Sequence, residues 1–155
     1  MMKKDSKLYF EDFVEGEEMV SMGRTVTEAD VVMFAGMSGD WNPLHTDEEF
    51  ARTTPFGKRI AHGALGFVIQ SGLFSRIDKI RQAAIVVIMG FKDWRYTKPV
   101  FIGDTLRVRL TVTSVKDSTS KKDRGVLTLK REVINQKDEV VQEGITDNLI
   151  LKRPA

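Results

Sequence analysis

Residues 62–75 constrain the fold of this chain more than any other segment does. Their spacing is helical, yet apolar side chains occur on almost every side of the helix, at Ala64, Leu65, Phe67, Val68, Ile69, Leu73 and Phe74. A helix that is apolar all round is buried all round, so this segment needs other elements around it. Glycines lower its helix propensity, and we attribute them to the close approach of a neighbouring backbone, at Gly63, Gly66 and Gly72.

Several predicted strands could surround this helix. Apolar and polar residues alternate along residues 105–112, which is the period of a strand with one solvated face. Further strands are predicted around residues 19–26, 85–89, 127–133 and 140–151. The simplest architecture is α+β, with an antiparallel sheet curled around one buried central helix.

Helix signals also occur before the central helix. Thr27 is a good N-cap, and Asp30 three residues later completes a capping box. This helix continues to about Met37, and Gly39 suits its end. Asp47 can cap a second short helix.

Length and composition limit what the chain can be. Its 155 residues make a single domain, residues 1–155, and a hydrophobic share of 41% is enough for a core. The chain has no cysteine, which excludes disulfides and thiolate metal sites. The net charge is only +2, with Lys and Arg scattered among acids, which argues against nucleic acid as a partner.

No segment favours a membrane or export. The longest uninterrupted apolar run, residues 83–89, is too short to cross a bilayer. Lys3 and Lys4 are followed by polar and acidic residues, so they do not begin a signal peptide. We therefore expect a soluble, cytoplasmic protein with no membrane contact.

Asp40 and His45 are the first candidates for chemistry. They lie in a turn after a helix, where side chains project into a cleft rather than into a core. A carboxylate and an imidazole placed close together can share the uptake and delivery of a proton near neutral pH. Spacing alone leaves a structural interpretation open, because Asp40 could be a turn residue and His45 an ordinary surface or core histidine.

Three blocks of sequence, in a fixed order, narrow this choice. The first covers residues 38–47 and is followed by Phe50-Ala51; the second covers residues 56–65 and contains His62-Gly63; the third covers residues 94–105. Together they resemble the MaoC-like hydratase/dehydratase family, which includes the (R)-specific enoyl-CoA hydratases. The resemblance implies a single hot-dog fold. It also implies an enzyme that interconverts a trans-2-enoyl thioester and the (R)-3-hydroxyacyl thioester.

The resemblance also assigns roles to residues. Asp40 would act as the main base on the catalytic water, and His45 would help to position the water and share its proton. The backbone N–H of Gly63, at a helix start, would stabilise the thioester oxyanion. The substrate-binding set would be Asn42, Gly57, His62 and Ser71, with Asn42 bracing the loop and the Ser71 hydroxyl supporting the aspartate. Structural alternatives stay open: Gly63 could simply permit close packing, Asn42 could only shape the turn, and the Ser71 hydroxyl could bond a carbonyl of its own helix.

The family implies neither a metal nor a cofactor, since coenzyme A enters as part of the substrate. The thioester carrier could be coenzyme A or acyl carrier protein, and a chain with one such unit is expected to form a homodimer. Possible partners for the coenzyme phosphates are Arg59, Arg95 and Lys98, and Trp94 and Tyr96 could line an acyl tunnel or belong to the core.

Two other functions stay open beside the hydratase. A hot-dog thioesterase would share the fold and the thioester, but it usually works through one carboxylate without the Asp/His loop. A non-catalytic acyl-binding subunit of a heteromeric dehydratase would be expected to lose Asp40 or His45, and both are present.

Overall fold

A computed structural model describes residues 7–154 of the chain. The helices are η1 (Phe10–Asp12), α1 (Glu28–Ser38), α2 (Pro43–Thr46), α3 (Glu48–Arg52), α4 (Gly63–Ser75) and α5 (Asp78–Gln82). The strands are β1 (Glu18–Val20), β2 (Arg24–Thr25), β3 (Ile85–Tyr96), β4 (Thr105–Asp117), β5 (Arg124–Ile134) and β6 (Val140–Leu151). Lys3 and Lys4 lie outside the described residues.

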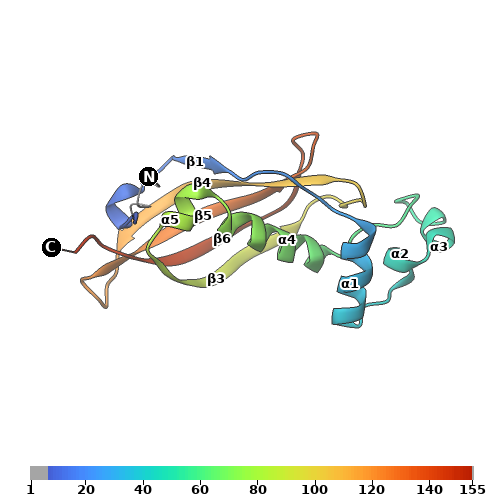
Figure 1. The fold of residues 1–155 in the computed structure, drawn as a ribbon, viewed down its shortest axis with the longest axis horizontal. Helices are drawn as coiled ribbons and strands as arrows, with labels where there is room; N and C mark the ends of the chain where they lie inside the picture. Colours follow the sequence, from blue (N-terminus) through green and yellow to red (C-terminus); the bar gives the residue numbers. More distant parts are fainter. Residues whose placement is uncertain (1–6, 155) are drawn as a thin grey trace, which may run out of the picture.

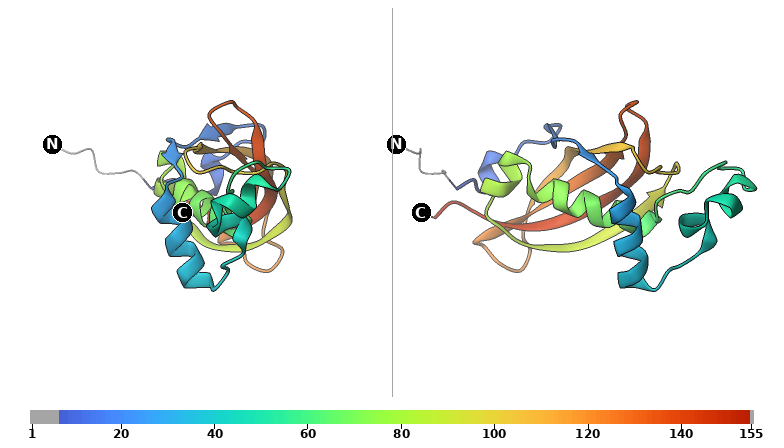
Figure 2. Two further views of the ribbon diagram at one scale, coloured as in Figure 1. Left: turned by 90° about the vertical axis from the view of Figure 1, so that its right-hand side faces the viewer. Right: turned by 45° about the vertical axis from the view of Figure 1, so that its right-hand side comes forward.

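The strands form one antiparallel sheet in the order β1-β4-β5-β6-β3, with β2 paired to β4 (Figure 1). Buried and partly exposed residues alternate along β4, β5 and β6, so one face of the sheet builds the core. Helix α4 runs along the sheet, which bends around it (Figure 2). This confirms the predicted sheet wrapped around a central helix.

The prediction that the central helix is buried on every side is wrong for the described chain. Leu65, Ile69 and Leu73 are buried in the core. The side of the helix that faces away from the core is exposed to solvent, at Ala64, Val68, Gly72 and Ser75. The sheet curves around only part of the helix, so apolar residues on its other side stay accessible. Val68, for example, is 52% exposed.

Helices α1, α2 and α3, residues 27–52, form a helical extension that projects past the end of the sheet (Figure 1). We call the strands with α4 and α5 the sheet body. The capping box of Thr27 and Asp30 is present at the start of α1, and Gly39 ends α1 in the left-handed region with φ 77°. The Asp47 side chain accepts from the Phe50 N–H at the start of α3. These three sequence predictions are confirmed.

Several elements differ from the sequence predictions. The predicted first strand is two short pieces, β1 and β2, and β3 extends to Tyr96 rather than ending near Met89. Helices α2 and α5 were not predicted, because four or five residues are too few to show a helical period. Within the described residues, no helix is long and apolar enough to cross a membrane.

Candidate active site

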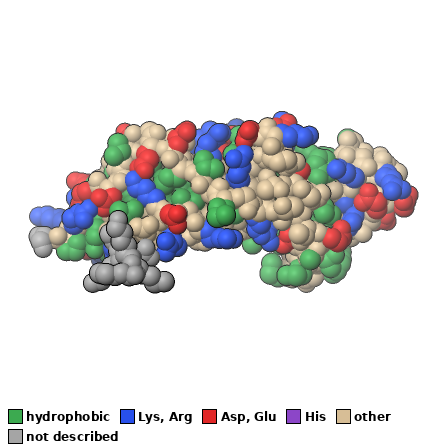
Figure 3. All heavy atoms as spheres, turned by 45° about the horizontal axis from the view of Figure 1, so that its top comes forward, with side chains coloured by type: hydrophobic (Ala, Val, Ile, Leu, Met, Phe, Trp, Pro, Cys, Tyr) green, Lys and Arg blue, Asp and Glu red, His purple; other side chains and the backbone are tan. Residues whose placement is uncertain are grey.

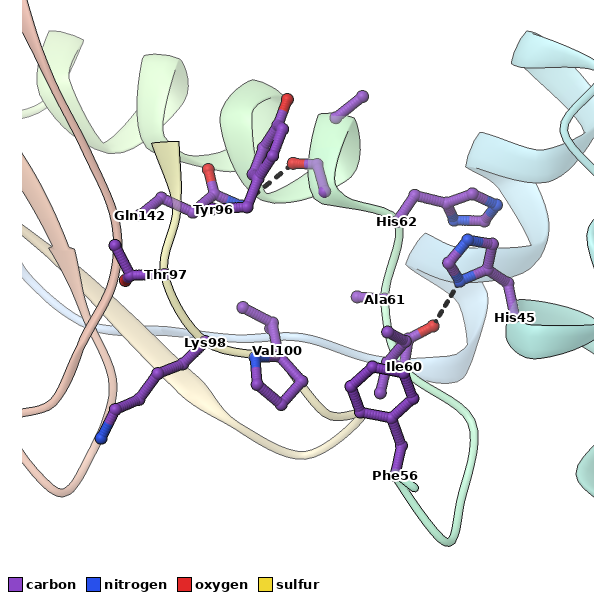
Figure 4. Close-up of a pocket in the computed structure, with 13 residues that line it drawn as sticks. His45, Phe56, Ile60, Ala61, His62, Tyr96, Thr97, Lys98, Val100 and Gln142 are labelled. Atoms are coloured by element: carbon purple, nitrogen blue, oxygen red, sulfur yellow. Dashed lines mark hydrogen bonds between the residues drawn. The ribbon is translucent and has the colours of Figure 1, made fainter. Parts of the chain in front are cut away.

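A pocket of about 490 Å³ opens where α4 begins, between the helical extension and the sheet body (Figure 4). His45 enters from α2, and the loop before α4 supplies residues 60–62. The end of β3 and the segment after it form the opposite wall together with Gln142 of β6. The lining is mainly apolar, with a few polar groups, as is usual for a small-molecule site.

His45 is held in one orientation by the backbone of the loop before α4. Its Nδ1 lies 2.8 Å from the carbonyl oxygen of Ile60. A carbonyl oxygen only accepts, so in this hydrogen bond Nδ1 carries the proton. In the neutral ring the lone pair is then on Nε2, which is the nitrogen left to accept a proton or orient a water.

Local signals in the sequence explain how α2 presents His45. Asn42 caps this one-turn helix, since its Oδ1 accepts from the Leu44 N–H at 2.9 Å, and Pro43 occupies the first helical position. The Asn42 N–H also donates to Oδ1 of Asp40 at 3.2 Å. Asn42 therefore links Asp40 and His45, which is the geometry expected of a loop brace.

Asp40 follows the left-handed turn at Gly39 and has an exposed side chain. Its backbone carbonyl accepts from Nε2 of His62 at 2.9 Å. Side-chain oxygens or nitrogens of Asp40, His45 and His62 all lie within 4.8 Å of one another. The structure thus brings the two predicted catalytic residues together and adds His62 to them.

His62 is 2% exposed and lies between the rings of His45 and Phe34, with centroids 3.8 Å and 4.9 Å away. The two imidazole planes are tilted by 32° to one another, and each ring uses one nitrogen to bond a main-chain carbonyl. Asp40, His45 and His62 are also types of residue that bind a metal ion, with one donor atom of each within 4.8 Å of the others. His62 supports the loop of Asp40 and the ring of His45.

Gly63 is the first residue of α4 and lines the pocket. His62, in the N-cap position, makes no side-chain hydrogen bond to the helix, so no cap side chain occupies the first N–H groups. A Cβ at residue 63 would lie 3.0 Å from the Tyr96 ring, which explains why glycine is found there. The helix start is thus open to an electron-rich ligand atom.

Of the predicted substrate-binding set, His62 lines the pocket, whereas Asn42, Gly57 and Ser71 do not. The Ser71 hydroxyl donates to the Phe67 carbonyl at 3.2 Å and accepts from Gln70, and no hydrogen bond in the described chain joins it to Asp40. Gly57 adopts φ 71° in the turn before the pocket, where its role is backbone geometry. Neither one contributes a wall to the pocket.

The basic candidates for the coenzyme phosphates are mostly engaged. Arg59 bonds Glu28 at 2.7 Å and Glu48 at 3.1 Å, and these carboxylates raise the pKa of its guanidinium. Lys98 lines the pocket but pairs with Glu139 at 2.7 Å. Arg59 therefore serves to hold α1 and α3 to the loop before α4.

Of the two aromatic candidates, Tyr96 lines the pocket, whereas Trp94 packs against Phe67 and Phe91. Gln142 was missed by sequence reasoning. A polar residue at an inward position of β6 interrupts the alternation of that strand, and this interruption was the available signal.

Comparisons with known proteins agree on one family. The family model described as MaoC like domain matches residues 12–134. An (R)-specific enoyl-CoA hydratase of Rhodospirillum rubrum is 39% identical over 107 residues, which are 69% of this chain and 71% of the relative. A 3-hydroxybutyryl-CoA dehydratase of Methylorubrum extorquens is 37% identical over 105 residues, which are 68% of this chain and 64% of that longer protein.

Solved structures give the same result over nearly the whole chain. A MaoC-like dehydratase from Rhodospirillum rubrum has a TM-score of 0.83 at 30% identity, covering 96% of this chain and 99% of that one. A structure described as a monoamine oxidase regulatory protein from Archaeoglobus fulgidus has a TM-score of 0.85 at 40% identity, covering 96% and 97%.

Proposed function

Because this chain belongs to the MaoC-like domain family, we propose that it interconverts a trans-2-enoyl thioester and the (R)-3-hydroxyacyl thioester. Its relatives are hydratases and dehydratases, so the chain is an enzyme of the carbon–oxygen lyase class. One observation carries the finer proposal. His45, with its Nε2 left free, and the uncapped start of α4 line one pocket, and a side-chain oxygen of Asp40 lies within 4.8 Å of a ring nitrogen of His45.

In hydration, Asp40 and Nε2 of His45 hold a water molecule, and Asp40 takes its proton as the oxygen bonds to C3 of the enoyl chain. The C2–C3 π electrons move toward the thioester carbonyl, whose oxygen gains negative charge. The Gly63 N–H donates to that oxygen. A proton then returns to C2, so one water has been added, and dehydration is the reverse.

The substrate we propose is an acyl thioester of coenzyme A, with acyl carrier protein as the other carrier. The pocket has Tyr96, Thr97 and Lys98 on one wall, and an elongated thioester can lie along this wall. We propose that the enzyme works in the cytoplasm and needs no separate cofactor.

We further propose that two copies form a homodimer. Strand β3 ends the sheet and pairs only with β6 among the described strands, so its other edge is unpaired. Exposed apolar side chains follow this edge strand, at Val86, Val87, Ile88 and Met89. An unprotected apolar edge of this length favours pairing with a second chain. Sedimentation at several protein concentrations measures the assembly.

The experiment that tests the activity follows the ultraviolet absorbance of crotonyl-CoA, which disappears when its double bond is hydrated. We expect rapid loss with the wild type and no release of free thiol. Asp40→Asn and His45→Gln should each lower kcat by about 10²- to 10⁴-fold, the range for general acid–base groups. Neither variant should unfold, because Asp40 is exposed and His45 is only partly buried.

Glu49→Gln is the matched control for Asp40→Asn, because it makes the same change at an exposed carboxylate of the same helical extension. It should keep wild-type activity. Thiol release at the rate of absorbance loss would show a thioesterase instead. Wild-type rates in either catalytic variant, or unfolding of both, would overturn the assignment of Asp40 and His45.

A further inference from the structure

The first turn of α4 has to be held in place without a side-chain cap. A helix whose first N–H groups are left for a ligand has no cap side chain to fix its first turn. Transition-state stabilisation nevertheless needs those donors at a fixed place, because a displacement of about 1 Å can cost on the order of 10²-fold in rate. Some other contact must therefore hold the first turn.

Gln142 supplies such a contact from the sheet. Its Nε2 donates to the carbonyl oxygen of Gly63 at 3.0 Å, across from β6 to α4 (Figure 4). The bond holds the turn by its acceptor and leaves the N–H donors free. Since a carbonyl cannot donate, the nitrogen of the amide must be the atom that faces Gly63.

Gly66 makes room for this contact. A Cβ at residue 66 would lie 2.2 Å from Nε2 of Gln142, so any side chain there would push the amide away. Tyr96 lies beside Gly63, because a Cβ added at residue 63 would lie 3.0 Å from its ring. The first turn of α4 is thus fixed between a β3 ring and a β6 amide.

The side-chain oxygen of Gln142 indicates that the important group of this amide is its N–H donor. Gln142 is 1% exposed, and its Oε1 has no hydrogen-bond partner in the described chain. A buried acceptor without a partner lowers stability, and an apolar side chain of similar size would fill the same space without that cost. The amide is therefore poorly explained by packing alone.

We infer that Gln142 is a positioning residue for the proposed hydratase, holding the peptide groups at the start of α4 against the thioester oxygen. The inference rests on the proposed function and deepens it. The Gly63 carbonyl and the Ala64 N–H belong to one peptide group, so the bond from Gln142 also polarises that N–H toward the pocket. Gly66 also belongs to this arrangement, because the absence of a side chain there leaves room for the Gln142 amide.

The first test replaces the amide with an apolar side chain of similar size. Gln142→Met should lower kcat by about tenfold, within the cost of misplaced groups, and should change KM less. Gln82→Met is the control, since it makes the same substitution away from the pocket and should keep wild-type kcat. An unchanged kcat in a folded Gln142→Met variant would overturn the inference.

The second test gives the donor a pH switch. In Gln142→Glu the side chain can donate to the Gly63 carbonyl only when protonated, and burial raises the pKa of such a carboxyl. The ratio of its kcat to that of the wild type should rise as pH falls from about 8 to about 6. A ratio that stays flat would show that only the shape of the side chain matters.

The third test uses the neighbouring glycine. Gly66→Ala should displace the flexible end of Gln142 and lower kcat about as much as Gln142→Met does. In the double variant the two effects should not add, because one contact is lost in both cases. Additive effects would contradict a shared contact.

A readout independent of turnover separates this inference from the proposed reaction. The amide proton resonance of Ala64 should move upfield in Gln142→Met, because its peptide group loses a hydrogen bond at the carbonyl. If the wild type hydrates no enoyl thioester but this shift is seen, the proposed reaction fails and the contact stands. An active wild type with an unchanged Ala64 resonance would sink the inference alone.

Discussion

The sheet body and the helical extension are held together by different forces. In the sheet body, β4 and β5 contribute a row of completely buried aliphatic side chains to the core that also contains the inner face of α4, among them Leu106, Leu110, Leu127 and Leu129. In the extension only Val31, Phe34, Ala35 and Ala51 are buried, while large apolar side chains such as Met33 (70%) and Met37 (74%) are exposed. Figure 3 shows hydrophobic side chains gathered at this end of the molecule.

In the helical extension, where few apolar side chains are buried, polar contacts hold the helices in place. Caps at Thr27, Asn42 and Asp47 start the three helices, and Arg59 ties α1 and α3 to the loop before α4. The comparison indicates that Asp40 and His45 lie in the region with fewer buried side chains, where it meets the sheet body. Hydrogen bonds set their positions more than packing does.

The largest effect is expected in the sheet body. Leu129→Ala removes a completely buried side chain and should lower the free energy of unfolding by about 3 kcal/mol, through lost burial and the cavity left behind. Denaturant unfolding measures this loss. Met33→Ala in the extension should change it by less than about 0.5 kcal/mol. A larger loss for Met33→Ala would show that a second chain covers this side chain in the assembled protein.

Arg59 should matter to activity more than to stability. Arg59→Met removes the links to Glu28 and Glu48, so the extension should shift relative to the pocket. We expect kcat/KM to fall by about tenfold, equivalent to about 1.4 kcal/mol of transition-state stabilisation. Arg52→Met is the control, because its ion pair with Glu49 is exposed on both sides. Equal activities of Arg59→Met and Arg52→Met would contradict the view that polar contacts of Arg59 position the helical extension.

The capping box at the start of α1 should contribute a smaller amount. Thr27→Ala removes the acceptor for the Asp30 N–H and should destabilise α1 by about 1 kcal/mol. Hydrogen exchange should quicken in α1 and stay unchanged in β5. Thr119→Ala, at an exposed loop position, serves as control. Faster exchange throughout β5 would mean that the two regions open together.

The smallest effect concerns polar contacts on the sheet body. Burial pushes the pKa of the Glu132 carboxyl up, but hydrogen bonds from Arg109 and Lys130 outweigh burial and lower it below its ordinary value of 4.5. The carboxylate therefore stabilises the fold above that value, and this contribution is lost as pH falls through the lowered one.

Glu132→Gln should cost about 0.5 kcal/mol near neutral pH, and the gap to the wild type should close in acid. Unfolding measured near pH 7 and near pH 3 checks this. A gap that persists in acid would show that the amide disturbs packing instead of removing a charge.

Sequence patterns predicted the sheet body better than its edges. The last strand was predicted with the bounds of β6 although the alternation of its sequence is poor, and the cap of α1 follows from the Thr27–Asp30 spacing. Strand β3 was predicted too short, because an edge strand exposed on most of its residues shows no alternation. The exposed stripe on α4 could not be predicted, since composition shows that a helix is apolar but not how far a sheet wraps around it.

The candidate site divides in the same way. Asp40 and His45 are five residues apart, so their proximity follows from local turn signals and the family motif. His62 stacks on His45 from beyond a loop, and Gln142 reaches Gly63 from a distant strand. Such contacts are set by tertiary packing, which no local pattern encodes.

The anchors of the two histidines have a consequence for how this enzyme can diverge. His45 is fixed by the carbonyl of Ile60 and His62 by the carbonyl of Asp40, so each imidazole is held by main chain. Substitution cannot delete a main-chain carbonyl, so residue 60 is free to change as the pocket adapts to new acyl groups. Substitutions at residue 60 can therefore change the substrate specificity of the pocket while the tautomers of His45 and His62 stay the same.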